Sequence, residues 1–393
     1  MKQKRLLSIG LLVVVAAIVA SPFAYRRFRT YQLHRAVAAL CDSAHSDLQA
    51  GRFPEAEADY KRGIAMAPTD PRPYFGLAVA YEHAARLDLA IATLEQLQNR
   101  NPNAPHLWCH LAEAYVGTYD VTREREVAEK AIAVEPECPR ALSCYADAEE
   151  RSRYFDTAAA ALIKEERIVP DDVSVTVSLI NLLVLKGDYE QAANRADEAL
   201  KAHPDSAQLH YLTGMSWARM PVRAHAEQTA MEHLKRAVEI APNWLVPHVE
   251  LGRLYQSEAK IQPAITEMET ALKQSPNHTS VLSSLTALNS LAQLYRQTGN
   301  PRAEEIDREF SRLQQITDQI TGLRRKYKAD AATDEEIVAL AQVESEFGAQ
   351  GPALYHLRRL LLKDPSNAAA QKLYANLDQK ARSGYHNDPR PGW

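Results

Sequence analysis

The side chains best suited to chemistry lie in one short stretch, where His106, Cys109 and His110 fall within two turns of a predicted helix. Two histidines four residues apart on one helical face can bind a metal ion. A firm site needs a third or fourth protein ligand and partners that orient the first two, and the neighbouring sequence supplies neither. We therefore expect no metal and no other cofactor, and expect these side chains to line a binding surface.

The four cysteines have no C-x-x-C spacing, which excludes zinc ribbons, thioredoxin-like motifs and c-type haem attachment. Cys138 and Cys144 are close enough in sequence to pair in an oxidising compartment. Against this pairing, Cys138 falls in a predicted loop and Cys144 in the next helix. The sequence also contains no G-x-G-x-x-G, Walker loop, G-x-S-x-G or H-E-x-x-H motif. We expect the protein not to be an enzyme.

Composition favours short helices and argues against nucleic acid. The chain has 393 residues with only 14 glycines, too few for many tight β turns, while 21 prolines must interrupt its helices. Its net charge is −4, but residues 1–36 hold seven basic residues and no acidic one. The rest of the chain therefore carries −11, a charge that disfavours phosphate binding.

The elements that position these residues recur with a period of 34. Prolines fall at 68, 102, 136, 170 and 204, then at 242 and 276. Counting back from each proline gives windows that carry a small residue at the eighth and the twentieth position, as in Ala78 and Ala90. Two antiparallel helices approach closely only where side chains are small, so each window predicts a helix pair in contact at these sites.

The windows resemble the tetratricopeptide repeat, whose pattern has an aromatic residue at position four, leucine at seven, a small residue at eight, tyrosine at eleven, alanine at twenty and twenty-seven, and proline at thirty-two. The clearest copies are PRPYFGLAVAYEHAARLDLAIATLEQLQNRNP (71–102) and LVPHVELGRLYQSEAKIQPAITEMETALKQSP (245–276). The resemblance covers nearly all of 37–367. It implies an all-α, right-handed superhelical solenoid of stacked antiparallel helix pairs.

We expect about nine such repeats, followed by a capping helix at 368–382 and a disordered tail at 383–393. The repeats span 37–70, 71–104, 105–138, 139–172, 173–206, 207–244, 245–278, 285–333 and 334–367. In the third, residues 119–124 replace the usual turn and alanine, which predicts an altered turn. In the sixth, four extra residues near Met220 predict a longer loop between its helices.

The eighth repeat predicts a long second helix with an apolar stripe over residues 306–327. The stripe consists of Ile306, Phe310, Leu313, Ile316, Ile320, Leu323 and Tyr327, at spacings of four and three. We expect this helix to lie against its own neighbours. The alternative is a homodimer formed through the stripe.

A membrane segment precedes the repeats. After the basic flank 1–5, residues 6–25 form 20 uncharged residues, which as a helix reach about 30 Å, the thickness of a bilayer core. No good signal-peptidase site follows, because Ile18 and Pro22 disfavour the two candidate cuts. We expect one transmembrane signal-anchor, with residues 26–36 as a basic juxtamembrane linker. The alternative is a secreted protein after signal cleavage.

Basic residues flank this anchor in nearly equal number on its two sides, so the positive-inside rule gives little preference for either orientation. We expect the amino terminus inside and the body outside the cytoplasm, on the periplasmic side in a bacterium. A cytoplasmic body on a reversed anchor is the alternative. Tyr25, Phe28 and Tyr31 among arginines suit the interface between lipid and water.

The resemblance also implies a binding groove lined by positions five, nine and thirteen of each first helix, here called the groove positions. They fall on Phe75, Val79, His83, Cys109, Glu113, Ser143, Asp147, Arg151, Val177, Asn181, Tyr211, Met215, Arg219, Val249 and Arg253. Apolar centres with charged edges are typical of an interaction groove. We therefore predict a membrane-anchored scaffold that binds a protein segment, in envelope complex assembly for example. The alternative function is a structural, self-associating element.

Overall fold

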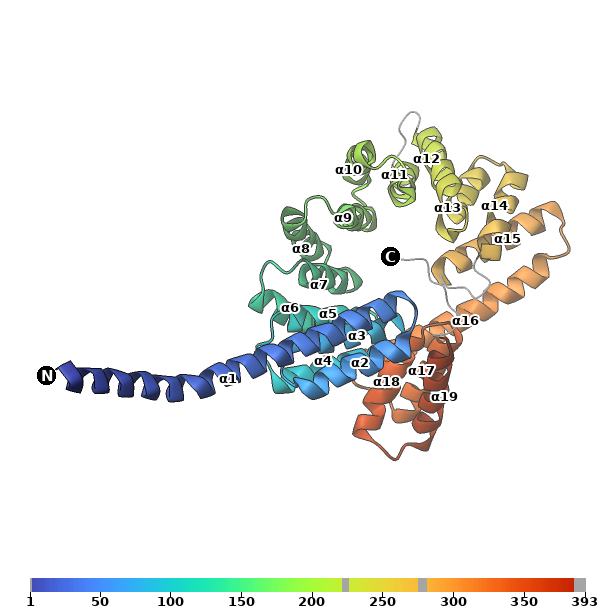
Figure 1. The fold of residues 1–393 in the computed structure, drawn as a ribbon. Helices are drawn as coiled ribbons and strands as arrows, with labels where there is room; N and C mark the ends of the chain where they lie inside the picture. The colour runs from blue at the N-terminus through green and yellow to red at the C-terminus, as the bar shows by residue number, and fades with distance from the viewer. Residues whose placement is uncertain (1, 221–225, 275–280, 385–393) are drawn as a thin grey trace. The chain divides into compact units, whose positions relative to one another are not determined.

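The computed structural model describes the backbone of residues 2–220, 226–274 and 281–384, and the side chains of residues 25–220, 226–274 and 281–381. In these ranges the chain forms nineteen helices and no strand (Figure 1). The helices are α1 (Lys2–Gln49), α2 (Phe53–Met66), α3 (Pro71–His83), α4 (Leu87–Arg100), α5 (Leu107–Val116), α6 (Val121–Val134), α7 (Pro139–Arg151), α8 (Phe155–Ile168), α9 (Val173–Lys186), α10 (Tyr189–Ala202), α11 (Ala207–Arg219), α12 (Ala226–Ile240), α13 (Leu245–Ser257), α14 (Ile261–Gln274), α15 (Val281–Thr298), α16 (Ala303–Lys328), α17 (Asp334–Glu346), α18 (Gln350–Lys363) and α19 (Ala368–Gly384).

The helices belong to two compact units. One consists of the chain up to Leu107 together with the end of α19 from Lys380, and the other of Trp108–Gln379. In the first unit α1, α2, α3 and α4 pack in chain order, and α1 also touches α3. In the second, every helix from α6 to α18 packs against the next. The prediction of an all-helical solenoid is confirmed.

Polar caps fix where several first helices begin. The side chain of Asp70 accepts a hydrogen bond from the backbone N–H of Arg72 at 3.1 Å, and Asp172 accepts one from that of Ser174 at 2.9 Å. Such caps satisfy backbone donors that have no partner within the helix. Asp70 and Asp172 stand at position thirty-four of their repeats, two residues after the proline. Each thus caps the first helix of the next repeat.

In the described repeats, the residue at position fifteen, in the turn between the two helices, has a positive φ. There φ is positive in Ala85 (54°), Tyr119 (61°), Arg153 (64°), Gly187 (91°) and Ala259 (57°). The third repeat keeps this φ, but its turn is altered as predicted, because the N–H of Asp120 donates to Oγ1 of Thr118, whereas that of Arg86 in the second repeat donates to the backbone oxygen of Tyr81. Tyr119 adopts the same left-handed conformation as alanine and arginine elsewhere, because the surrounding packing outweighs the local cost to a side chain.

Paired helices meet at the small residues, as the spacing predicted. Ala78 and Ala90 are 1% and 0% exposed. At Gly214 an added Cβ would lie 2.7 Å from Cγ of Leu234 and 3.1 Å from the backbone oxygen of Ala230. The sixth repeat therefore needs glycine at position eight.

Helix α1 differs from the prediction for the amino terminus. It runs without a break from Lys2 to Gln49, so residues 26–36 are helical rather than a linker. No glycine or proline lies between residues 23 and 49 to stop the helix, which accounts for the correction. The predicted anchor falls almost wholly on side chains outside the described residues. Within the described ones, no helix has the length and apolar character to span a bilayer.

Helix α16 is long, and two residues of its apolar stripe are buried. Ile306 and Leu313 are each 3% exposed and belong to one core with Leu291 and Leu294 of α15. The remaining stripe residues are half-buried. The helix therefore lies against its own neighbours, as expected, and the homodimer stays a prediction. The predicted long loop in the sixth repeat and most of the predicted tail lie outside the described residues.

Candidate functional site

The groove positions differ widely in exposure. Cys109, Met215 and Val249 are buried, at 2%, 5% and 2% exposed. For these three the expectation of an open groove surface is wrong, because the residue packs into the core between neighbouring pairs; Val249, for example, shares a core with helices α14 and α15. The others are half-buried (Phe75, Val79, Glu113, Asp147, Arg151, Val177, Asn181, Tyr211) or exposed (His83, Ser143, Arg219, Arg253).

Tyr211 is closer to the core than its repeat position suggested. Its ring packs edge-on against Trp244 at 5.0 Å between centroids and touches two apolar clusters. Burial raises the pKa of Tyr211 to about 12. This residue contributes to packing, so the side chains of α9 and the exposed arginines Arg219 and Arg253 are better candidates for contact with a partner.

The structure brings together two predicted groove residues and one that we missed. Arg151 on α7 donates to Glu124 on α6 at 3.0 Å, to the backbone oxygen of Val116 at 3.2 Å, and to Asp147. Glu124 has no exposed surface and stands at position twenty, where other repeats have alanine. The sequence could have indicated this residue, because a glutamate at a position that is otherwise alanine departs from the repeat pattern.

Burial dominates the electrostatics of this cluster. It raises the pKa of Glu124 to about 9, although Arg151 opposes the shift, and raises the pKa of Glu165 on α8 to about 7. The buried thiol of Cys144 has a raised pKa for the same reason. A neutral carboxyl and a protonated thiol are poor nucleophiles.

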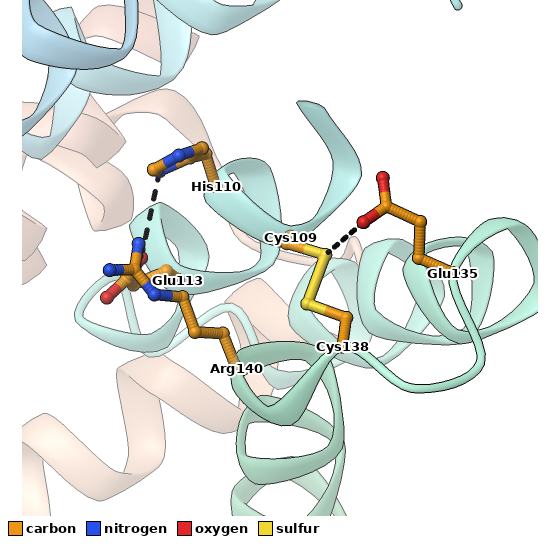
Figure 2. The surroundings of a disulfide bond; sticks show 6 residues. All are labelled: Cys109, His110, Glu113, Glu135, Cys138 and Arg140. Carbon is orange, nitrogen blue, oxygen red and sulfur yellow. Dashed lines mark hydrogen bonds and ion pairs between the residues drawn. A yellow bond between two sulfur atoms is a disulfide. The ribbon is translucent and has the colours of Figure 1, made fainter. Parts of the chain in front are cut away.

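A disulfide joins α5 to the start of α7 (Figure 2). It links Cys109 with Cys138, while Cys144 is a free thiol, so the pairing of Cys138 with Cys144 that we considered is wrong. The pair spans 29 positions in sequence, and Cys138 occupies the N-cap position of α7. Cys109 therefore offers no free thiolate to a metal ion.

Charged side chains surround the disulfide (Figure 2). Oε2 of Glu135 lies 3.8 Å from Sγ of Cys109. Arg140 on α7 donates to Glu113 on α5 at 2.9 Å, and Nδ1 of His110 lies 3.8 Å from the same carboxylate. Glu113 is thus a groove residue whose charge is already paired across two repeats.

The third repeat also contacts the ninth, far away in sequence. The hydroxyl of Tyr355 on α18 donates to Asp120 at 3.0 Å, and Arg359 donates to the same oxygen at 2.9 Å. We call Asp120, Tyr355 and Arg359 the clasp. The ring of Tyr115 meets that of Tyr355 edge-on at 6.1 Å. Within this unit, α18 therefore contacts the turn between α5 and α6.

A second layer of contacts supports the clasp. The guanidinium of Arg324 on α16 lies 3.8 Å above the ring of Tyr119 and donates to Glu344 at 2.8 Å. Burial raises the pKa of Glu344 to about 7 and lowers that of the adjacent His356 to about 3. His356 is therefore neutral at ordinary pH. No short-range pattern in the sequence indicated this network.

The stacked, similar helix pairs define a helical-repeat solenoid. Family models of the tetratricopeptide repeat match residues 47–115 and 178–243, so the repeats in these stretches are tetratricopeptide repeats. Repeats of this class generally mediate contacts between proteins.

Two known proteins illustrate the likeness. Cellulose synthase operon protein C of Pseudomonas fluorescens (strain SBW25) is 22% identical over 285 residues, a match that covers 65% of this chain and 22% of that protein. The chain thus spans about a fifth of the length of this relative. A tetratricopeptide repeat protein from Parabacteroides merdae ATCC 43184 matches with a TM-score of 0.53 and 13% identity, over 65% of this chain and 99% of the other. This similarity concerns the fold.

Proposed function

We propose that this protein is a scaffold, not an enzyme, which binds a segment of a protein partner at its groove positions. The observation that carries the proposal is the uninterrupted stacking of helices α6 to α18, which places similar first-helix surfaces side by side. Val177 and Asn181 on α9 are half-buried, and Arg219 and Arg253 on α11 and α13 are exposed. Partly open apolar and amide groups beside charges are typical of protein interfaces.

Charge reversal tests this proposal. Arg219→Glu and Arg253→Glu together should abolish capture of the partner by the full chain, while the melting temperature stays unchanged because both side chains are exposed. Lys201→Glu, on the exposed surface of the second helix α10, is the matched control and should leave capture intact. If the control variant loses partner capture and the double variant keeps it, the binding surface lies on the second helices instead.

We further propose that residues 6–25 anchor the protein in a membrane, with the body on the extracytoplasmic side, where it would serve the assembly of an envelope complex. Tyr25, Phe28 and Tyr31 support an interfacial position, being 66%, 60% and 60% exposed on a continuous helix. The Cys109–Cys138 disulfide supports an oxidising compartment.

Extraction of membranes at alkaline pH tests the anchor. We expect the intact chain to stay with the membrane pellet, because 20 apolar residues are costly to withdraw from lipid. A soluble mature form that begins near residues 21–25 would instead identify a cleaved signal. The alternative of self-association through residues 306–327 is less well supported, since Ile306 and Leu313 are buried within their own chain.

A further inference from the structure

Two histidines of the sixth repeat face each other across its helix pair. Nδ1 of His210 on α11 lies 3.0 Å from Nδ1 of His233 on α12, and the ring centroids are 5.2 Å apart with an interplanar angle of 35°. Both side chains are half-buried, so solvent reaches them. The groove positions do not include either residue.

The ring of His210 is held in place from its far side. Nε2 of His210 donates to the backbone oxygen of Pro204 at 2.9 Å. The same link to the preceding proline occurs at position four of two other repeats, where Tyr74 donates to Pro68 at 2.9 Å and His248 to Pro242 at 2.9 Å. With Nε2 carrying the proton, Nδ1 of His210 keeps its lone pair and points it toward His233.

This arrangement has the features of a metal-ligand histidine. Histidines that bind metals usually donate their other ring nitrogen to a carbonyl or carboxylate, which fixes tautomer and orientation. Negative charge also gathers nearby, since Asp197 on α10 and Glu232 both act on the charge of His233. These carboxylates would stabilise a bound cation through their negative charge.

The distance between the two nitrogens suits one shared ion. Two nitrogens that each lie about 2.0–2.1 Å from an ion are about 2.9 Å apart at a right angle and about 3.3 Å apart at the tetrahedral angle. The separation of 3.0 Å falls between these values. Imidazole nitrogen selects Zn²⁺, Ni²⁺ or Cu²⁺ over Mg²⁺ and Ca²⁺, which prefer oxygen.

We propose that His210 and His233 form a surface-accessible site of low affinity for one divalent transition-metal ion, held by the two Nδ1 atoms with water in place of a third and fourth protein ligand. A hydrogen bond between the two Nδ1 atoms requires Nδ1 of His233 to carry the hydrogen, because Nδ1 of His210 does not. Binding needs no net loss of a proton, because this hydrogen can move to Nε2 of the same ring. The ion would join α11 to α12 within the sixth repeat.

The seventh repeat provides a natural control. His248 occupies the same position and makes the same link to a proline, but its partner is a carboxylate, Glu267, at 2.6 Å. That hydrogen bond raises the pKa of His248 against the effect of burial. A histidine that donates from both ring nitrogens, to the carboxylate and to the proline oxygen, has no lone pair left for a metal ion.

Calorimetric titration with ZnCl₂, NiCl₂ or CuCl₂ tests the site in the full chain, in detergent and without a histidine tag. We expect one ion per chain, a loss of affinity of about tenfold or more in His233→Gln and in His210→Gln, and no change in His248→Gln. Zinc should also raise the melting temperature of the wild type but not of His233→Gln.

Two outcomes would overturn the proposal. One is the absence of saturable binding up to about 1 mM metal, the range of weak association. The other is binding that His233→Gln leaves unchanged, which would place the ion elsewhere. Should His210→Gln fail to fold because it loses the link to Pro204, His233→Gln decides the question, since His233 makes no such link to a proline in the described structure.

Discussion

Glu124 has none of its surface exposed, yet it carries an ionisable carboxyl where neighbouring repeats have alanine. In the folded chain its pKa is about 9 because burial disfavours the charged form, whereas the unfolded chain has the ordinary value of 4.5. Between these values the folded state binds more protons than the unfolded state. The contribution of Glu124 to stability is therefore present below about pH 4.5 and is lost as the pH rises toward 9.

We predict that the free energy of unfolding falls from pH 5 to pH 8, by up to about 1.4 kcal/mol per pH unit for each such group. Glu165 and Glu344, whose pKa values are raised to about 7, act in the same direction. Glu124→Gln removes one titrating group and should reduce the slope. Urea unfolding at several pH values measures it, and equal slopes for both proteins would contradict the assignment.

For some residues, the position in the repeat does not predict whether the side chain is exposed. The position of Met215 and Val249 in the repeat is plain from the sequence, but their burial depends on the helices packed against them. The glutamate at position twenty can be read from the sequence as a departure from alanine. Its arginine partner, 27 residues further on, can be found only once α6 and α7 are seen side by side.

At the scale of helix pairs, the small residue at position eight decides how close two helices come. Gly214→Ala should destabilise the protein by about 1–3 kcal/mol, because the new Cβ meets both Leu234 and the backbone of α12. Gly252→Ala should change stability by less than about 1 kcal/mol, since its nearest neighbour is the mobile end of Met268 and alanine favours a helix. Thermal denaturation compares the two, and a larger loss in Gly252→Ala would contradict the packing.

The disulfide is a second link between elements, from α5 to the start of α7. Reduction should lower the free energy of unfolding by about 2–4 kcal/mol, because the Cys109–Cys138 bridge closes a loop of 29 positions in the unfolded chain. Cys138→Ser should have the same lowered free energy of unfolding as the reduced wild type, even without reductant. A reductant that shifts this variant as much as the wild type would mean that the bridge is not the cause.

Much of the element scale follows from the sequence, for identifiable reasons. A proline follows the second helix of most repeats, though not α16, and small residues mark the contacts between helices. The start of α3 at Pro71 or α7 at Pro139 therefore coincides with a predicted repeat boundary. The helical form of residues 26–36 was missed because basic charge suggested a linker, whereas nothing there interrupts a helix. The altered turn of the third repeat could be predicted because residues 119–124 depart from the repeat pattern, although the positive φ of Tyr119 could not.

At the scale of the whole second unit, the clasp joins the third repeat to the ninth. Asp120→Ala and Tyr355→Phe should each destabilise the protein, and their effects should couple by about 0.5–3 kcal/mol, because each removes one side of the same hydrogen bond. The double variant matters since Asp120 also caps α6 through the N–H of Arg123. Additive effects in urea unfolding would contradict the contact.

A repeating sequence pattern indicates only how adjacent repeats pack together. The clasp joins distant repeats, so the pattern could not predict it. Asp120 and Tyr355 are 235 residues apart and belong to different repeats. Their contact depends on the summed rotation of all the pairs between them, to which each repeat adds a small amount.

Site-specific photocrosslinking in intact cells tests the central claim, partner binding at the groove positions, most directly. A photoreactive side chain placed at Asn181 of α9 or Arg253 of α13 should form a crosslink to one discrete partner. The same group at Glu198 or Lys201 of α10, which are 73% and 72% exposed, should form none. Crosslinks from the α10 positions, with none from α9 or α13, would contradict the account and assign the binding surface to the second helices.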